Sequence, residues 1–264
     1  MKRIGFIGAG NMGGALCLAA SKADCALYVS DPDTKKAQAL CKKTGATWSD
    51  HDTVCTVCDL IFLGVKPQML SDVAAQLSPA LDERTTPYCL VSMCAGVTLS
   101  RLGELFPGAA VIRIMPNTPV AVGQGMIQYC YNEKTTRGQI DTFLYAMQHA
   151  GKVDLLDEAL FDAATAVSGC GPAFAYMFAD ALAKGGAECG LPYEKAAEYA
   201  SQMLLGAALM LQNDPRTPEE LRIVVCSPGG STIEGVKVMQ QNGLEQTVID
   251  TVKASFERNK QLGK

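Results

Sequence analysis

The sequence predicts an α/β protein with an N-terminal doubly wound, Rossmann-type parallel sheet and a C-terminal all-α domain. Short apolar runs alternate with amphipathic segments over the first 155 residues, and a glycine-rich turn directly follows the first apolar run. From residue 156 to residue 264 only helical patterns continue. Alternation at this spacing is typical of βαβ units with right-handed crossovers. We therefore expect two domains, residues 1–155 and 156–264.

The elements of the first domain follow from apolar runs and their boundaries. Residues 59–64 are nearly all apolar, as expected of a parallel strand covered on both faces. Asp31-Pro32 places a proline near the first turn of a helix, which Gly45 ends. Strands are predicted over residues 3–7, 26–30, 59–64, 88–93, 110–115, 124–131 and 151–155. Helices are predicted over residues 11–21, 31–44, 67–81 and 99–106.

The second domain is predicted to be helical throughout. Its helices cover residues 157–167, 173–189, 193–212, 218–225, 231–241 and 244–262. Small residues are frequent between Ala179 and Ala187, so this helix can approach another helix closely. We expect a homodimer through the C-terminal helices, or a higher homo-oligomer, and hence a dimerisation domain.

Charge and hydropathy exclude several classes of partner. The formal net charge of −4 gives no electrostatic footprint for nucleic acid or for an anionic membrane. The longest apolar run, Met203 to Leu211, is far shorter than a membrane span. The N-terminus enters a strand pattern without the apolar region of a signal peptide. We expect neither nucleic-acid nor membrane binding.

The eleven cysteines do not form the even, regular pattern of a disulfide framework. Most lie in apolar runs, where a reduced cysteine behaves as a small hydrophobic residue, so we expect a cytoplasmic protein. Cys55 and Cys58 have the C-x-x-C spacing of a zinc ligand pair, but no second pair follows at a suitable distance. The simpler interpretation is two half-buried thiols, and no metal is expected.

The glycine-rich turn Gly8-Ala9-Gly10-Asn11-Met12-Gly13 predicts a dinucleotide site. It follows a strand and begins a helix inside a βαβ unit, which is the context that gives G-x-G-x-x-G its meaning. Gly8 allows a tight turn, Gly10 lets a pyrophosphate approach the backbone, and Gly13 lets helix and strand pack closely. The free N–H groups at the helix start face the phosphates. A glycine-rich turn without a ligand is the alternative.

Asp31 lies 23 residues after Gly8, at the end of the second predicted strand. A carboxylate there accepts hydrogen bonds from a ribose 2′-hydroxyl and repels a 2′-phosphate, which favours NADH. Lys35 and Lys36 are near enough to offset part of that repulsion. A helix N-cap before Pro32 is the alternative role for Asp31, and one residue can serve both.

Two later strand ends are expected to border the same cofactor, because ligands collect at the carboxyl ends of parallel strands. They are Gly64-Val65-Lys66-Pro67 and Ser92-Met93-Cys94-Ala95-Gly96, whose small residues leave room for a flat ring. Lys66 is either a cofactor-side lysine or a surface lysine. A third strand ends in Met115-Pro116-Asn117-Thr118-Pro119, where Asn117 offers a donor and an acceptor to a substrate.

Two further segments occur in the helical half: Val167-Ser168-Gly169-Cys170-Gly171-Pro172-Ala173 and Val225-Cys226-Ser227-Pro228-Gly229-Gly230-Ser231-Thr232-Ile233. Together with the glycine-rich turn and the M-P-N-T-P segment, they resemble pyrroline-5-carboxylate reductases. The resemblance runs from Ile4 to about Phe256, and the segment from Val225 to Ile233 is its most specific part.

This resemblance implies reduction of L-1-pyrroline-5-carboxylate, a small cyclic imine, to L-proline with NADPH or NADH. It implies that the cofactor, already assigned to the turn that ends at Gly13, is lined by Ile7, Gly8, Ala9, Gly10, Asn11, Met12, Gly64, Val65, Lys66, Pro67, Met93, Cys94 and Ala95. It implies that Gly230, Ser231 and Thr232 hold the substrate. Two positions depart from the family: Cys170 stands where serine is frequent, and Asp31 stands where NADPH-preferring relatives carry a small polar residue. The second departure puts the family's NADPH preference in doubt.

The residues suit this chemistry independently. N–H groups at the start of the Ser231 helix can bind a carboxylate, and the Thr232 hydroxyl can orient a ring nitrogen; plain helix capping is the alternative role. We expect His51 and His149 to be exposed, so the proton for the nitrogen arrives with the substrate or through water and Thr232. A β-hydroxyacid dehydrogenase is a rival class, but no lysine follows Gly171 before Lys184. A non-catalytic dinucleotide sensor is the other alternative.

Overall fold

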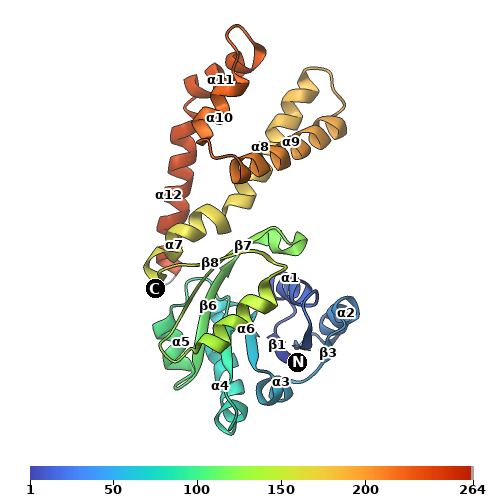
Figure 1. The fold of residues 1–264 in the computed structure, drawn as a ribbon, viewed down its shortest axis with the longest axis vertical. Coiled ribbons are helices and arrows are strands. Elements are labelled where there is room, and N and C mark those ends of the chain that lie inside the picture. Colours follow the sequence, from blue (N-terminus) through green and yellow to red (C-terminus); the bar gives the residue numbers. More distant parts are fainter. Residues whose placement is uncertain (263–264) are drawn as a thin grey trace. The chain divides into compact units, whose positions relative to one another are not determined.

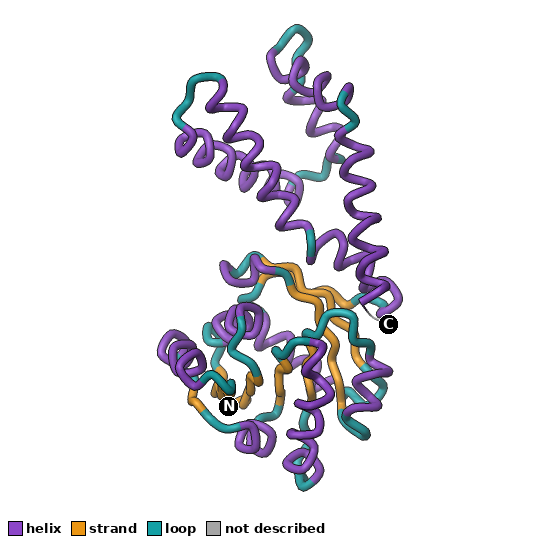
Figure 2. Tube along the Cα trace, turned by 180° about the vertical axis from the view of Figure 1, so that it is seen from behind, coloured by secondary structure: helices purple, strands orange, loops and turns teal. Residues whose placement is uncertain are grey.

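The computed structural model describes residues 1–262 and contains one mixed sheet with helices on both of its faces (Figures 1 and 2). The strand order is β3-β2-β1-β4-β5-β6-β7-β8, so the chain changes direction across the sheet between β1 and β4. The strands are β1 (Lys2–Ile7), β2 (Cys25–Ser30), β3 (Thr47–Trp48), β4 (Leu60–Leu63), β5 (Cys89–Ser92), β6 (Ala110–Pro116), β7 (Gly125–Tyr131) and β8 (Gly151–Leu155). The predicted doubly wound sheet is confirmed.

One strand pair departs from the predicted parallel sheet. β6 and β7 are antiparallel, with Met115 opposite Gln128, whereas all other pairs are parallel. Only residues 117–124 connect these two strands, and a parallel crossover needs a dozen or more residues. The connection is the 3₁₀ segment η2 (Thr118–Val122), which ends at Gly123 with a φ of +73°.

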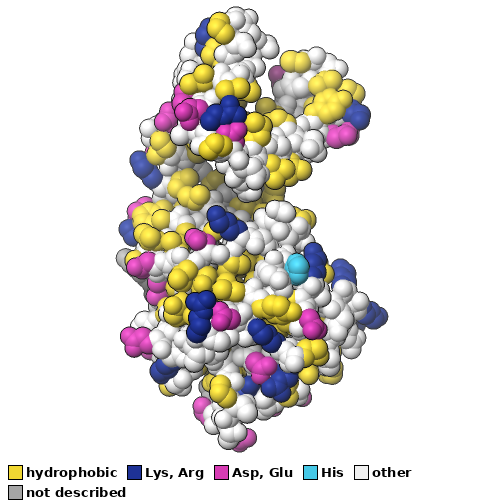
Figure 3. All heavy atoms as spheres, in the orientation of Figure 1, with side chains coloured by type: hydrophobic (Ala, Val, Ile, Leu, Met, Phe, Trp, Pro, Cys, Tyr) yellow, Lys and Arg dark blue, Asp and Glu magenta, His cyan; other side chains and the backbone are white. Residues whose placement is uncertain are grey.

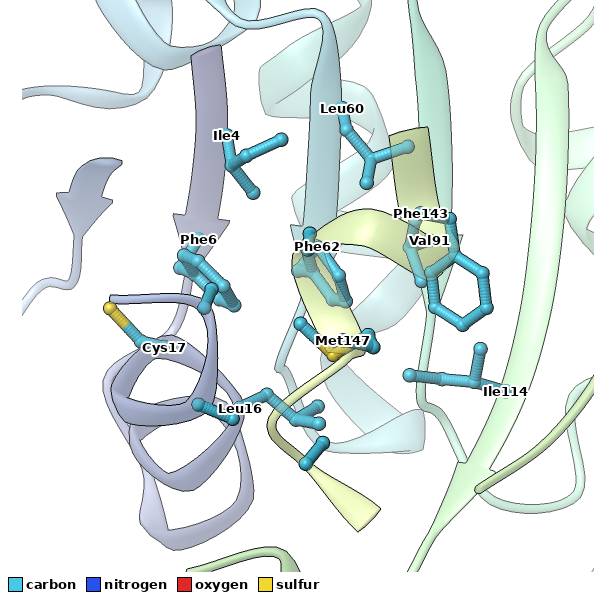
Figure 4. Packing of buried hydrophobic residues seen from close by; sticks show 14 of the residues in the cluster. Ile4, Phe6, Leu16, Cys17, Leu60, Phe62, Val91, Ile114, Phe143 and Met147 are labelled. Atoms are coloured by element: carbon cyan, nitrogen blue, oxygen red, sulfur yellow. The ribbon is translucent and has the colours of Figure 1, made fainter. Parts of the chain in front are cut away.

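Two hydrophobic clusters bury the two faces of the sheet. On one face α1 (Asn11–Ala20), α2 (Thr34–Thr44) and α6 (Arg137–Met147) cover β1, β4 and β5. Figure 4 shows this cluster, in which the rings of Phe6 and Phe62 stack with centroids 4.7 Å apart. On the other face lie α3 (His51–Val57), α4 (Leu70–Asp82) and α5 (Leu99–Leu105). Helices on both faces leave the strand ends as the open edge for a ligand.

The sequence prediction lacked the strand β3, the α-helices α3 and α6, and the 3₁₀ segment η2. β3 has only two residues, too few for an apolar pattern. α3 begins at Asp50, which accepts a hydrogen bond from the Thr53 N–H, and α6 begins with a capping box between Thr136 and Gln139. Both helix-start signals, the N-cap aspartate and the capping box, are recognisable in the sequence.

The C-x-x-C pair has no metal-site geometry. Cys55 and Cys58 are fully buried, and desolvation raises the pKa of each thiol to about 12. A zinc ligand must be a thiolate, which this environment disfavours. Among the residues that the structure describes, no three side chains of ligating type gather.

The internal contacts divide the chain into two units. The first comprises Met1–Cys170 and returns at Phe256 near the C-terminal end, and the second is Gly171–Ser255. By internal contacts the division falls at Cys170, whereas the sequence prediction placed the domain boundary at residue 155. Residues 156–170 stay with the sheet because η3 (Glu158–Leu160), α7 (Phe161–Ala164) and the π-helix η4 (Thr165–Gly169) bond and pack against β6 and β7. The roles assigned to residues 156–264 stay a prediction.

The second unit consists of helices α8 to α11 and most of α12. These are α8 (Gly171–Glu188), α9 (Tyr193–Asn213), α10 (Pro218–Val225), α11 (Ser231–Gln241) and α12 (Leu244–Leu262). Of residues 171–255 only Ala183, Ala196 and Ala200 are buried. Hydrophobic side chains are visible on the surface of these helices (Figure 3). No helix within residues 1–262 combines the length and the hydropathy that crossing a membrane requires.

Candidate functional site

The candidate dinucleotide site lies where β1, β2 and β4 end side by side. The Gly8 N–H donates to the Ser30 carbonyl at 2.8 Å, and the Gly64 N–H donates to the Ile7 carbonyl at 2.8 Å. These bonds extend the parallel ladders past the ends of the strands. They hold the three connecting loops at the point where the strand order reverses, which is where doubly wound sheets bind ligands.

Glycine is required at this point because three backbone segments meet. Gly8 has a φ of +102°, and a Cβ there would lie 2.4 Å from the Gly64 carbonyl oxygen. A Cβ on Gly13 would lie 2.3 Å from the Gly8 carbonyl oxygen. A Cβ on Gly10, by contrast, would meet no atom within 4 Å, so open space adjoins the backbone there.

Helix α1 begins beside that space with Gly10 as its N-cap and without a side-chain cap. Bare backbone, open space and free N–H groups together fit a pyrophosphate. The geometry of Gly8, Gly10 and Gly13 therefore agrees with the role that the sequence predicted for each, and it fits a dinucleotide.

Asp31 is bonded to the glycine-rich loop itself. Its Oδ2 accepts the Ala9 N–H at 2.6 Å, and its Oδ1 accepts the Asp33 N–H at 2.8 Å. The alternative role as N-cap is wrong, because α2 begins at Thr34 and Asp33 caps it by accepting the Lys36 N–H. A carboxylate has about four acceptor positions, so Asp31 keeps free positions for ribose hydroxyls.

A pocket of about 230 Å³ adjoins Asp31 on the side of β3. Its lining comprises Ser30, Asp31, Pro32, Thr34, Trp48, Ser49, Asp50 and His51. This lining includes two carboxylates and neither Lys nor Arg. Hydrogen bonds from Thr53 hold the pKa of Asp50 below its ordinary value, so Asp50 is ionised at neutral pH. A pocket of this charge suits a ribose hydroxyl better than a phosphate.

The two histidines differ in environment. His51 is half-buried, and its Nδ1 lies 2.7 Å from the Ser30 hydroxyl in the pocket beside Asp31. The expectation of an exposed His51 was wrong, because the short helix α3, which the sequence prediction missed, turns its first residue toward β2. His149 is exposed, as expected.

The predicted cofactor residues after β4 and β5 are neighbours. The Cys94 thiol donates to the Val65 carbonyl at 3.3 Å, and the Cys94 N–H donates to the Ser92 hydroxyl. The Cys94 side chain is buried, and desolvation raises its pKa, so this residue offers only backbone to a ligand. Ala95 and Lys66 are exposed at the same edge of the sheet.

An ion pair that the sequence prediction missed supports the loop after β5. The Arg113 guanidinium, 6% exposed, lies 2.7 Å from Glu158 Oε1 and stacks over the Phe161 ring with its Cζ 4.7 Å from the centroid. The same carboxylate oxygen accepts the Leu99 N–H at 2.7 Å. An arginine within an apolar strand was the available signal, because such a charge is buried only with a partner.

Asn117, predicted to bind the substrate, uses both ends of its amide within the first unit. Its Oδ1 accepts the Met126 N–H at 2.8 Å, and its Nδ2 donates to the Ser168 carbonyl at 3.0 Å. Gln128, which the prediction missed, donates from Nε2 to the Ser168 hydroxyl at 2.9 Å. Both amides therefore hold Ser168, in the π-helix η4.

The candidate substrate loop lies within the helical unit. Gly229 has a φ of +73°, the Gly230 N–H donates to the Ser227 carbonyl at 3.0 Å, and α11 begins at Ser231. Gly230 is the N-cap of α11, so helix capping by the Ser231 or Thr232 side chain is not observed. Both side chains are exposed, and no side chain of the described residues caps this helix. Its first N–H groups can therefore bind an anion.

Comparison with known proteins gives consistent results for both halves. Residues 158–262 match the family model for pyrroline-5-carboxylate reductase dimerisation, and residues 3–96 match that for NADP oxidoreductase, coenzyme F420-dependent. Pyrroline-5-carboxylate reductase 3 of Danio rerio is 35% identical over 99% of this chain and 91% of its own length. The Escherichia coli reductase is 32% identical over 100% of this chain and 99% of its own.

Solved structures agree with these relatives. Plasmodium falciparum pyrroline carboxylate reductase with NADP bound superposes with a TM-score of 0.88 at 29% identity, covering 100% of this chain and 98% of that one. The reductase from Coxiella burnetii gives a TM-score of 0.89 at 28% identity, covering 99% and 98%. By sequence over its full length and by fold, the chain belongs to the pyrroline-5-carboxylate reductase family.

Proposed function

We propose that this protein reduces L-1-pyrroline-5-carboxylate to L-proline with NAD(P)H, the last step of proline synthesis. The observation that carries the proposal is the uncapped start of α11 at Ser231 and Thr232, in a family member whose other unit has the geometry of a dinucleotide site. An anion cradle and a cofactor cradle in one chain suit an acidic substrate and a nucleotide co-substrate. Bound NAD(P)H supplies the hydride that reduces the C=N bond.

The chain's own contribution is placement and charge. The N–H groups of Ser231 and Thr232, at the start of α11, bind the substrate carboxylate, and the Thr232 hydroxyl hydrogen-bonds the ring nitrogen. His149 is exposed and His51 lies beside Asp31, so neither is proposed as the acid. The proton arrives with the substrate, or through water and Thr232.

For the cofactor, we propose that Ile7–Gly13, Gly64–Pro67 and Met93–Ala95 contact NAD(P)H, with the adenosine end at Asp31 and the nicotinamide end toward β4 and β5. Two carboxylates and neither Lys nor Arg line the pocket beside Asp31, which supports NADH as the preferred form. The Plasmodium relative was solved with NADP. We therefore propose that the choice differs within the family, and that Asp31 makes it here.

We propose a homodimer through the C-terminal helices, on which higher homo-oligomers can build. The helical unit buries almost nothing by itself, since Met177 is 73% exposed and Tyr176 63%. A hollow of about 860 Å³ between α10, α11 and α12 is lined by apolar residues such as Met239 and Ile249 together with charged ones such as Glu219 and Arg222. A second copy would cover such surfaces. Sedimentation as a stable monomer at micromolar concentration would reject this proposal.

The test of the proposed reaction is a spectrophotometric assay with pyrroline-5-carboxylate and NADH or NADPH. Thr232→Ala should lower turnover about tenfold to a hundredfold, as loss of a hydrogen-bonding or acid group does. Thr247→Ala is the matched control, because its hydroxyl bonds the Gly243 carbonyl within α12 and lies outside the loop. Wild-type kinetics in Thr232→Ala would remove Thr232 from the reaction.

The same assay separates the two alternatives. A β-hydroxyacid dehydrogenase needs a lysine after the Gly169-Cys170-Gly171 turn, but Lys184 is engaged with Asp180 at 2.6 Å on the surface of α8. A dinucleotide sensor would bind NADH and show no turnover with the imine. The cytoplasmic location expected from the cysteines stays a prediction.

A further inference from the structure

We propose that Asn117 and Gln128 are positioning residues for the reduction, which act by holding the π-helical turn Thr165–Gly169 beside the nicotinamide end of the cofactor site. Neither residue needs to touch the substrate for this role. The proposal rests on the proposed function, and it replaces direct substrate binding by Asn117.

The turn that they hold is irregular. The Cys170 N–H donates to the Thr165 carbonyl, five residues earlier, at 2.9 Å, which inserts an extra residue between α7 and α8. Single π turns inside helical runs occur frequently at functional sites. The irregular geometry is fixed from outside the helix, because Asn117 bonds the Ser168 carbonyl and Gln128 bonds the Ser168 hydroxyl. The Ser168 hydroxyl in turn donates to the Ala164 carbonyl.

The turn lies at the edge of the predicted cofactor site. A Cβ on Gly169 would lie 3.4 Å from the Met115 Cε at the end of β6. Thr165 and Met115 line a small cavity of about 20 Å³ together with Ala95, one of the predicted cofactor residues. The turn therefore borders the loop after β5, at the end of the sheet away from Asp31. In a doubly wound sheet this half receives the second nucleotide of the cofactor.

The energetics of Gln128 indicate a role other than stability. Gln128 is 4% exposed, and its Oε1 has no hydrogen-bond partner within the described part of the chain. A buried acceptor without a partner is costly, whereas an apolar side chain of similar shape in the same place is close to neutral. A glutamine is the better choice here only if its bond to Ser168 is needed. Local violations of this kind concentrate at functional sites.

The chain provides a matched control on the same pair of strands. Asn132 accepts the Val111 N–H at 3.0 Å and donates to the Ala109 carbonyl at 2.9 Å, so it uses its amide as Asn117 does. Asn132 lies at the opposite end of β6, far along the strand from the cofactor edge. Substitution of either asparagine removes equivalent bonds, but only Asn117 holds the turn.

The experiment compares Gln128→Met, Ser168→Ala, Asn117→Ala and Asn132→Ala in the full-length protein. For each variant, kcat and KM for pyrroline-5-carboxylate, the NADH dissociation constant and the thermal midpoint are measured. Gln128→Met and Ser168→Ala should each lower kcat about tenfold, because a small misplacement of reacting groups is costly. The NADH affinity of both variants should match the wild type. The thermal midpoint should stay unchanged in Gln128→Met, whereas Ser168→Ala should lower it, because the Gln128 amide is then buried without a partner. The double variant Gln128→Met with Ser168→Ala should be no slower than either single variant. Each substitution removes the same hydrogen bond, between Gln128 and Ser168, so their effects should not add.

Asn117→Ala should lose both thermal stability and turnover, and Asn132→Ala should lose thermal stability alone. Wild-type kinetics in Gln128→Met and Ser168→Ala would overturn the proposal. A loss of turnover in Asn132→Ala as large as that in Asn117→Ala would also overturn it, because the loss of turnover would then result from lower thermal stability and not from the position of the turn. A wild-type protein without activity would refute the proposed function and this role together, whereas an active wild type with unaffected variants refutes only the role.

Discussion

The choice between NADH and NADPH should depend on the carboxylate of Asp31. The perturbation is Asp31→Asn, which keeps the shape of the side chain and removes its charge. The amide oxygen can still accept one of the two backbone N–H groups, from Ala9 or from Asp33, but the amide nitrogen cannot accept the other. The variant therefore changes two terms, the repulsion of a 2′-phosphate and the anchoring of the glycine-rich loop.

The first term can be worked from the geometry. A carboxylate that hydrogen-bonds the ribose would lie about 5 Å from a doubly charged 2′-phosphate, and even at the dielectric constant of water this repulsion is about 1.7 kcal/mol. Its removal should raise the NADPH-to-NADH ratio of kcat/KM about 18-fold. The second term is the loss of one hydrogen bond to the loop. It should cost about 1 kcal/mol of binding free energy for both cofactors, which lowers kcat/KM roughly fivefold for each.

The assay is kcat/KM for both cofactors, measured side by side at saturating imine. Asp33→Asn is the matched control: it removes the same charge two residues away, but Asp33 caps α2 and does not line the pocket. It should shift the cofactor ratio far less. A wild type that already prefers NADPH would refute the reasoning, as would an equal shift in both variants, which would indicate general surface charge.

Further predictions concern the packing and charge around the site. Gly13→Ala should destabilise by about 1–3 kcal/mol and weaken NADH binding, because its Cβ would lie 2.3 Å from a backbone oxygen. Gly14→Ala, one residue on, meets only ordinary contacts and should be neutral or stabilising in thermal unfolding. Glu158→Ala should cost about 2–3 kcal/mol in denaturant unfolding, because it leaves the buried Arg113 without its ion-pair partner. Glu104→Ala, which breaks an exposed ion pair, should change stability by less than about 0.5 kcal/mol; equal losses in these two variants would contradict the burial argument.

The sequence was sufficient for features that local rules determine. Apolar runs located the long strands, and the spacing of Gly8, Gly10 and Gly13 assigned each glycine a role that the geometry matches. The start of α11 at Ser231 was also predicted, since Pro-Gly-Gly cannot continue a helix. These are features in which one residue type is needed at one position.

Features that depend on distant partners were not predictable. The Arg113–Glu158 pair joins residues 45 apart in the sequence, and nothing local relates them. Likewise, the partners of the Asn117 amide lie 9 and 51 residues away, so its bonds to Met126 and Ser168 were not predictable. The antiparallel direction of β7 follows from its connection to β6, because residues 117–124 are too few for a parallel crossover.

The sheet-containing unit is made of two separate parts of the chain, and the second part is synthesised last. Its closing segment begins at Phe256, and Asn259 there donates to the Asp162 carbonyl at 3.1 Å. The helical unit is thus an insertion whose residues must all leave the ribosome before the earlier unit receives its last segment. A nascent chain arrested before Phe256 would therefore carry the nucleotide cradle in a unit that lacks the bond from Asn259 to Asp162.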